Sequence, residues 1–99
     1  MKTVFVNTST LIAIGNKRDT FHFQAVKMSE SLKQINANFV TTSGILLEFV
    51  NAFSPVNLKP VAIKLVEAII HSKKWNCVYI DNDLMQKGFK LFKQMRDKN

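Results

Sequence analysis

The 99-residue sequence has little of several residue types, and each scarcity excludes a class of protein. Its single cysteine, Cys77, allows neither an internal disulfide nor a cysteine zinc cluster. Its three glycines stand isolated, so the sequence contains no GxGxxG or Walker phosphate loop. The apolar runs are short compared with the roughly 20 apolar residues of a membrane-spanning helix. Polar residues 7–10 also interrupt any signal-peptide core, so we expect a cytoplasmic protein without a membrane partner.

Acidic residues are scarce as well. The chain has 14 lysines and arginines against 7 aspartates and glutamates, which gives a net charge of +7. This balance favours nucleic acid, an anionic surface or an acidic protein as partner, without choosing among them. A length of 99 residues excludes a two-domain enzyme and predicts one domain with a modest core.

Hydrophobic periodicity predicts three short strands that alternate with five helices. The strands are expected at 2–6, 39–41 and 77–80, and the helices at 11–14, 21–35, 42–53, 60–70 and from the capping residues 81–83 to residue 95. Alternation of this kind indicates parallel strands with helical crossovers, and therefore predicts an α/β sandwich.

Each predicted helix has a capping signal and an apolar stripe. Thr8 and Ser9 are expected to cap the first helix, Asp19 the second, and Thr42 or Ser43 the third, while Pro60 suits the first turn of the fourth. The stripes comprise Phe21, Ala25, Met28, Leu32 and Ile35; then Leu46, Val50 and Phe53; then Val61, Leu65, Ala68 and Ile69; and finally Met85, Phe89, Phe92 and Met95.

The apolar stripes carry two further expectations. In the fourth helix Ile63, Val66 and Ile70 widen the stripe, which predicts that this helix is covered on much of its circumference. The phenylalanines fall at helical spacings and are expected in the core, and Cys77 is expected to open a buried strand.

Three segments resemble one family in order and spacing. They are 4–14 (VFVNTSTLIAI), 39–53 (FVTTSGILLEFVNAF) and 78–92 (VYIDNDLMQKGFKLF). Together they resemble PIN-domain ribonucleases, the fold of the VapC-type toxins of toxin–antitoxin pairs. The resemblance implies a PIN-like three-layer sandwich with a sheet of order 3-2-1-4-5, of which this chain would have the three strands 3-2-1 and lack the last two. It also implies Mg²⁺- or Mn²⁺-dependent hydrolysis of RNA, with four acidic side chains holding the metal.

Carried over by position, the resemblance gives an incomplete site. Glu48 matches the second acidic position of the family, and Asn7 stands where the first aspartate is expected. The last two acidic positions lie beyond Asn99, so the chain is expected to be a truncated PIN-like domain whose first strand becomes an exposed edge. An amide keeps one acceptor oxygen but loses the charge, so Mg²⁺ or Mn²⁺ binding and catalysis are expected to be weak or lost.

Other polar residues near the strand ends have open interpretations. Thr8 and Ser9 either contact substrate or cap a helix, and Lys17 and Arg18 are the candidates for RNA contact near the end of the first strand. Asp81 and Asp83 are expected to cap the fifth helix and not to hold a metal. His22 and His71 lack metal-ligand spacing.

Three functions remain open from the sequence. The first is a PIN-type ribonuclease, impaired in this form. The second is a non-catalytic remnant that binds an antitoxin or forms a homodimer with another PIN chain. The third is an unrelated small α/β binding module, for which no glycine-rich loop gives support.

Overall fold

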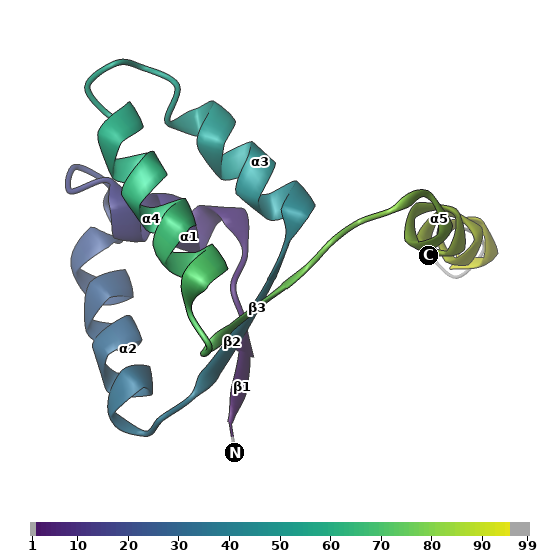
Figure 1. Cartoon of the computed structure of the whole chain (residues 1–99), viewed down its shortest axis with the longest axis horizontal. Coiled ribbons are helices and arrows are strands. Elements are labelled where there is room, and N and C mark those ends of the chain that lie inside the picture. The colour runs from purple at the N-terminus through teal and green to yellow at the C-terminus, as the bar shows by residue number, and fades with distance from the viewer. Residues whose placement is uncertain (1, 96–99) are drawn as a thin grey trace.

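A computed structural model describes residues 2–95 of the chain and has three strands and five helices (Figure 1). In chain order they are β1 (Thr3–Phe5), α1 (Thr8–Gly15), α2 (His22–Gln34), β2 (Asn38–Thr42), α3 (Ser43–Ala52), α4 (Lys59–His71), β3 (Trp75–Val78) and α5 (Asn82–Met95). The number, type and order of these elements confirm the prediction from periodicity.

The three strands form one parallel sheet in the order β1-β2-β3. Val4 pairs with Phe39 on β2, and Thr41 of β2 pairs with Cys77 on β3. The α/β class and the 3-2-1 strand order are therefore confirmed. β1 lies at one edge of this sheet, as expected, and its Phe5 side chain is exposed.

The core lies on one face of the sheet, beneath α1 to α4 (Figure 1). Alternate strand residues such as Val6, Phe39 and Thr41 point into it, because successive side chains of a strand face opposite sides. The largest fully buried side chains are Phe49, Phe53, Leu11, Ile69 and Thr41. The other face carries Phe5, Val40 and Val78 interleaved with polar side chains, and none of these residues is fully buried.

The helix caps differ from the prediction at two places. Asn7, and not Thr8 or Ser9, is the N-cap of α1. The α2 helix begins at His22 without a side-chain cap, while the Asp19 carboxylate accepts a 2.9 Å bond from the Phe21 amide in the preceding turn. The cap predicted for the third helix is confirmed, because the Thr42 hydroxyl accepts a hydrogen bond from the Ile45 amide at 3.1 Å.

The third strand was predicted two residues too late. Trp75 begins β3, because its ring stacks on Phe39 of β2 with centroids 5.0 Å apart. Tyr79 and Ile80 follow the strand, and the Ile80 amide donates to the Ser43 hydroxyl at 2.9 Å instead of continuing the ladder. The single cysteine thus lies inside β3 and does not open it.

The buried faces of α3 and α4 are narrower than expected. In α3 the buried residues are Leu46 and Phe49, whereas Val50 is 42% exposed. In α4 only Ala62 and Ile69 are buried, so the expectation that this helix is covered around much of its circumference is wrong. The reason is that α4 packs against β3, α3 and α1 on one side and has no second layer over its other side.

The phenylalanines divide into two groups. Phe39, Phe49 and Phe53 are buried, as predicted. The expectation that all of them are core residues is wrong, because five are more than half exposed: Phe5, Phe21, Phe23, Phe89 and Phe92. Periodicity identified each helix as amphipathic, but it omitted the buried residues Phe49 of α3 and Ala62 of α4 from the stripes. It also gives no information on whether a partner covers a stripe.

The α5 helix projects from the rest of the molecule after the extended segment that follows β3 (Figure 1). None of its residues within the described part of the chain is buried. Across residues 2–95, no helix is both long and apolar enough to cross a membrane.

Candidate functional site at the carboxyl edge of the sheet

The carboxyl ends of β1 and β2 are joined by a buried hydrogen bond. The Thr41 hydroxyl donates to the carbonyl oxygen of Val6 at 3.0 Å, and Thr41 is fully buried. This bond fixes the point where the chain leaves β1 toward Asn7. Because β2 leads directly into α3, the same edge of the sheet also carries the helix that holds Glu48. Ligands of open parallel sheets generally bind at this edge.

Asn7 is the best-defined polar residue of this edge. Its Oδ1 atom accepts two bonds of 3.0 Å, one from the Thr10 amide and one from the Ser9 hydroxyl. Two donors therefore already engage the oxygen that would otherwise face a cation. The side-chain nitrogen of an amide carries only donors, so it cannot bind a metal ion. Thr8 follows the cap as the first residue of α1 and is partly buried.

Glu48 lies on the exposed side of α3. Its neighbours Leu46 and Phe49 point into the core, which directs Glu48 outward. Within residues 2–95 no ion pair or hydrogen bond involves its carboxylate. Glu48 is therefore free to accept a ligand, but the surrounding residues do not preorganise it.

The donor set at this edge does not fit a divalent cation held by protein ligands. Mg²⁺ and Mn²⁺ require several anionic or carbonyl oxygens in a fixed arrangement. The described residues contain no group of three or more histidine, cysteine, aspartate or glutamate side chains able to hold a metal ion. Asn7 is neutral and its oxygen caps α1. Glu48 therefore offers a cation one carboxylate, where several anionic oxygens are needed.

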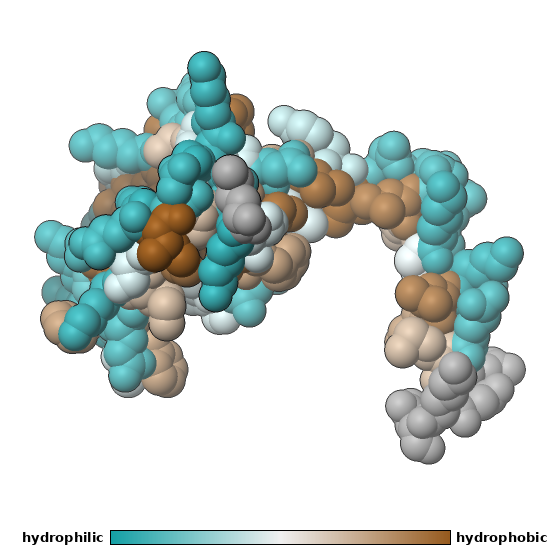
Figure 2. Space-filling view, turned by 90° about the horizontal axis from the view of Figure 1, so that it is seen from below, coloured by the Kyte–Doolittle hydropathy of each residue, from teal (hydrophilic) through white to brown (hydrophobic). Residues whose placement is uncertain are grey.

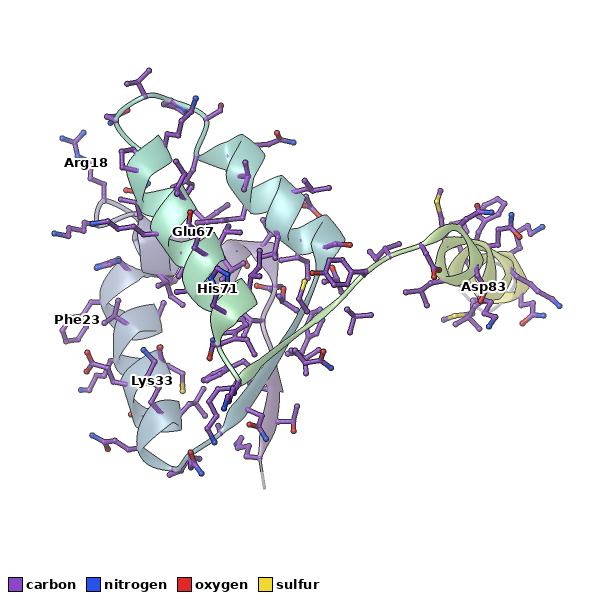
Figure 3. The ribbon with its side chains drawn as sticks, viewed as in Figure 1. Arg18, Phe23, Lys33, Glu67, His71 and Asp83 are labelled. Atoms are coloured by element: carbon purple, nitrogen blue, oxygen red, sulfur yellow. The ribbon has the colours of Figure 1, made fainter. Side chains whose placement is uncertain are left out.

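The basic candidates lie at a different place. Lys17 and Arg18 follow Gly15 and Asn16, so they are at the opposite end of α1 from Asn7. Figure 3 shows the Arg18 side chain pointing outward from the molecule. An eight-residue helix spans about 12 Å. The length of α1 therefore separates these two residues from Asn7 along the chain, and their contact with RNA stays a prediction. The Arg18 amide bonds to the Asn16 side chain at 3.0 Å, and both basic side chains are exposed.

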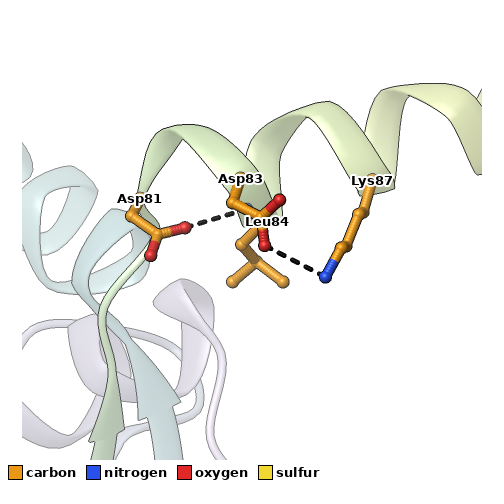
Figure 4. Close-up of polar contacts among 4 residues, drawn as sticks. All are labelled: Asp81, Asp83, Leu84 and Lys87. Carbon is orange, nitrogen blue, oxygen red and sulfur yellow. Dashed lines mark hydrogen bonds and ion pairs between the residues drawn. The ribbon is translucent and has the colours of Figure 1, made fainter.

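The two aspartates after β3 have structural roles at the start of α5 (Figure 4). The Asp81 carboxylate accepts from the Leu84 amide at 2.8 Å, which is the capping role predicted for it. Asp83 lies in the first turn and pairs with Lys87 at 3.0 Å. Both partners of this pair are well exposed, so the pair adds little stability.

A groove beside β1 was missed by the sequence analysis. It has a volume of about 640 Å³ and lies between β1, α1 and α2. Phe21, Ala25, Met28 and Leu32 of the predicted α2 stripe line it. The signal was present in the sequence, but the stripe was interpreted as a core face. The α2 stripe instead forms one wall of an open surface, since Phe21 is 63% and Met28 61% exposed.

Two other candidate residues have structural partners. The His22 ring nitrogen Nδ1 lies 2.7 Å from the carbonyl oxygen of Ala13, which ties α2 to α1. Cys77 is a free thiol, and burial raises its pKa above the ordinary value. A raised thiol pKa lowers the fraction of thiolate, so Cys77 is a poor nucleophile at neutral pH.

Comparison with solved structures places the fold. The chain is similar to VapC20 of Mycobacterium tuberculosis, described as a toxin that cleaves the sarcin–ricin loop, with a TM-score of 0.75 and 21% sequence identity. The similarity covers 97% of this chain and 71% of that chain. No family model and no curated protein matches the sequence. At this identity the similarity shows the fold, and the fold of this chain is PIN-like, with three parallel strands and five helices.

Proposed function

We propose that this chain is a PIN-like protein of the toxin–antitoxin ribonuclease class that binds RNA without hydrolysing it in the 1–99 form. The PIN-like fold and the similarity to a structurally known toxin support the class. The absence of hydrolysis is supported by Asn7, because its Oδ1 atom caps α1 at the position where the family resemblance expects a carboxylate.

The loss of hydrolysis follows from the charge at the strand ends. Hydrolysis of a phosphodiester in this class depends on Mg²⁺ or Mn²⁺, which activates water and neutralises charge on the phosphate. Glu48 alone supplies one negative charge, and Asn7 supplies none. These residues therefore do not support a metal-dependent step in this chain.

The binding of RNA follows from the uncompensated basic residues. Of the lysines and arginines in residues 2–95, Lys87 is the one that forms an ion pair. Lys17 and Arg18 are exposed in the turn after α1 and have no carboxylate partner in the same range. Such cations bind phosphates with little sequence preference, and salt weakens the binding.

A second candidate is a protein-binding role, with an antitoxin or a further PIN-like chain as partner. The large apolar side chains left exposed on α2 and α5 favour it, since contiguous exposed apolar surface marks interaction sites. The two candidates are compatible, because the basic turn and the apolar faces are separate surfaces.

The decisive experiment measures cleavage and binding in parallel. A mixed RNA pool is incubated with Mn²⁺ and the wild-type chain, Asn7→Asp or Glu48→Ala, and binding is followed by fluorescence anisotropy. We expect no cleavage by the wild type and binding that weakens steeply with salt. Reversing charge in Lys17→Glu/Arg18→Glu weakens binding, whereas the matched change Lys33→Glu on α2 has less effect.

Two outcomes would contradict the proposal. Cleavage by the wild type that disappears in Glu48→Ala means that a functional metal site forms after all. Binding that is absent at low salt, or that is unaffected by charge reversal at Lys17 and Arg18, removes RNA as the partner and leaves the protein-binding candidate.

A further inference from the structure

The α5 helix separates apolar from polar side chains more completely than any other helix of the chain. At about 100° per residue, its apolar side chains fall within roughly 160° of the helix circumference, and polar residues alone occupy the rest. Figure 2 shows hydrophilic side chains on the outer surface of the helix and apolar ones on its inner surface. The side chains of this apolar face are Leu84, Met85, Phe89, Leu91, Phe92 and Met95.

The apolar face of α5 has no cover within the described part of the chain. Its six side chains are each between 43% and 69% exposed, and no residue of the helix is buried. A free helix of 14 residues is only marginally stable in water, because most helix stability in proteins comes from packing of the apolar face. The face therefore calls for a partner outside residues 2–95.

The charges on the polar side of α5 are mostly positive and lie at defined places. Lys87 and Lys93 lie near the two borders of the apolar face, and Lys90 lies opposite its centre. The Lys93 Nζ atom lies 5.0 Å from the centroid of the Phe89 ring, so this lysine stem runs along the edge of the face. Asp83 is the single acidic residue of the helix, and it is paired with Lys87.

We propose that α5 lies flat in the surface of an anionic phospholipid bilayer, with its apolar face among the acyl chains and its lysines at the headgroups. A wide apolar face of leucine and phenylalanine, a lysine-rich polar face and low overall hydrophobicity are typical of helices that bind in the plane of this interface. Lysines at the borders keep their stems on apolar surface and their charged ends in the headgroup layer.

The proposal goes beyond RNA binding by Lys17 and Arg18 and does not depend on it. The expectation of no membrane partner rested on the short apolar runs, which exclude a helix that spans a bilayer. A helix that lies on the surface needs no long apolar run, because its polar side stays in water.

The distribution of charge favours a lipid surface over a protein partner for this face. A protein that covered the face would need acidic residues along both of its borders to match Lys87 and Lys93, whereas anionic headgroups surround a flat-lying helix on both sides. Each lysine near such a surface strengthens binding roughly fivefold. The net charge of +7 adds attraction at longer range.

The segment before α5 allows the apolar face to reach a bilayer. Residues 79–81 belong to neither strand nor helix and are exposed. The Ile80 amide is bonded to the Ser43 hydroxyl, and α5 begins two residues later. Because the apolar face is on the inner surface of the helix, binding requires α5 to turn about the residues that follow this bond (Figure 2). Since no residue of α5 is buried, this turn disrupts no core packing.

The first test is flotation of the whole chain with vesicles. The probes are vesicles of equal parts phosphatidylglycerol and phosphatidylcholine, and vesicles of phosphatidylcholine alone. We expect the chain to float with the anionic vesicles at low salt, to float far less with the neutral ones, and to be released in part as salt rises. Circular dichroism should show more helix when anionic vesicles are added, because binding stabilises α5.

Substitutions on the apolar face separate this mode from general attraction of a basic protein. Phe89→Asp and Phe92→Asp should each weaken binding to anionic vesicles by about tenfold or more, because each removes an apolar side chain from the bilayer. The matched control is Phe23→Asp on α2, which changes the net charge equally at a side chain that is 75% exposed and should have little effect. Equal urea midpoints of the variants check that the body stays folded.

A second measurement determines which side of α5 enters the bilayer. In a Cys77→Ser background, a nitroxide label is attached at Gly88→Cys, among the apolar side chains, or at Lys90→Cys, on the polar side. Anionic vesicles should protect the label at residue 88 from a water-soluble relaxation agent and leave the label at residue 90 accessible.

Three outcomes would overturn the proposal. The first is no flotation with anionic vesicles at low salt. The second is flotation that Phe92→Asp and Phe23→Asp weaken equally, or equal protection of the labels at residues 88 and 90, since either result means attraction without insertion of α5. The third is a chain that ignores vesicles but self-associates in sedimentation through Phe89 and Phe92, which assigns the face to a protein partner.

Discussion

The hydroxyl of Thr41 donates to the carbonyl oxygen of Val6 across the first two strands, at 3.0 Å and out of contact with solvent. Thr41→Val keeps the volume and branching of the side chain but removes the donor. A buried carbonyl that loses its partner costs about 1–3 kcal/mol. We therefore expect a lower urea midpoint for Thr41→Val. Thr3→Val on the exposed part of β1 is the control and should change stability by less than about 0.5 kcal/mol; equal effects of the two changes would disprove the role of the bond.

The two rings at the centre of the core carry much of its stability. Phe49 and Phe53 lie with ring centroids 4.5 Å apart, and each is almost completely buried. Phe49→Ala should destabilise the fold by about 3–5 kcal/mol, because it removes buried surface and leaves a cavity. Phe23→Ala removes the same group from a side chain that is 75% exposed and should have little effect. Denaturant unfolding measures the free energy of unfolding of the two variants. Equal losses of stability would mean that Phe49 is not in the core.

The capping role of the side chain at position 7 can be separated from the effect of a negative charge there. Asn7→Asp keeps a side-chain oxygen for the Thr10 amide and adds a negative charge at a helix N-terminus, so it should be as stable as the wild type or slightly more stable. Asn7→Ala removes the cap and should cost about 0.5–2 kcal/mol. Thermal unfolding of the three proteins tests this order. A stable Asn7→Ala would show that the capping bonds contribute nothing.

Much of the fold could be predicted from local patterns, because those patterns act within a few residues. Capping residues such as Thr42 and stripes such as that of α5 predicted the order of the elements, and the alternation of strands and helices predicted the parallel sheet. What periodicity cannot supply is the identity of the surface that covers a stripe. Phe21 and Phe92 belong to predicted stripes just as Phe53 does, yet both are exposed while Phe53 is buried. The start of β3 was missed for a related reason, since Trp75 is placed by a ring contact with a distant strand.

The candidate site was predicted less well than the fold. The position of Asn7 at a strand end follows from local sequence, and the structure confirms that placement. The distance of Lys17 from Asn7 depends on the length of α1, which begins three residues earlier than predicted. Both basic residues follow the helix in the prediction as well, so what the sequence lacked was the direction in which α1 leads the chain away from the end of β1 (Figure 1).

The glycines of α1 and α5 should respond in opposite ways to the same change. In Gly15→Ala the added Cβ would lie 2.9 Å from Cε2 of Phe53, a ring that is 1% exposed and cannot move away. We expect a loss of about 1–3 kcal/mol from this overpacking. In Gly88→Ala the new methyl group meets nothing within 4 Å among residues 2–95, so the helix content of the protein should rise. Circular dichroism and urea unfolding measure both effects, and a stabilised Gly15→Ala would contradict the close packing of α1 on Phe53.

Cys77 gives the protein a dependence on alkaline pH whose sign can be derived. Burial raises the pKa of its thiol above the ordinary value of 9.0, so the folded protein holds this proton more tightly than the unfolded chain. As pH rises through the ordinary value, the unfolded chain loses the proton first, and the stability that Cys77 contributes at neutral pH decreases. The comparison uses Cys77→Ala, in which the contributions of all other groups cancel. The difference in urea midpoint between wild type and Cys77→Ala should shrink from about pH 7 to about pH 10. A difference that stays constant or grows over this range would mean that the thiol ionises as readily in the folded protein as in the unfolded chain, and hence that β3 does not bury it.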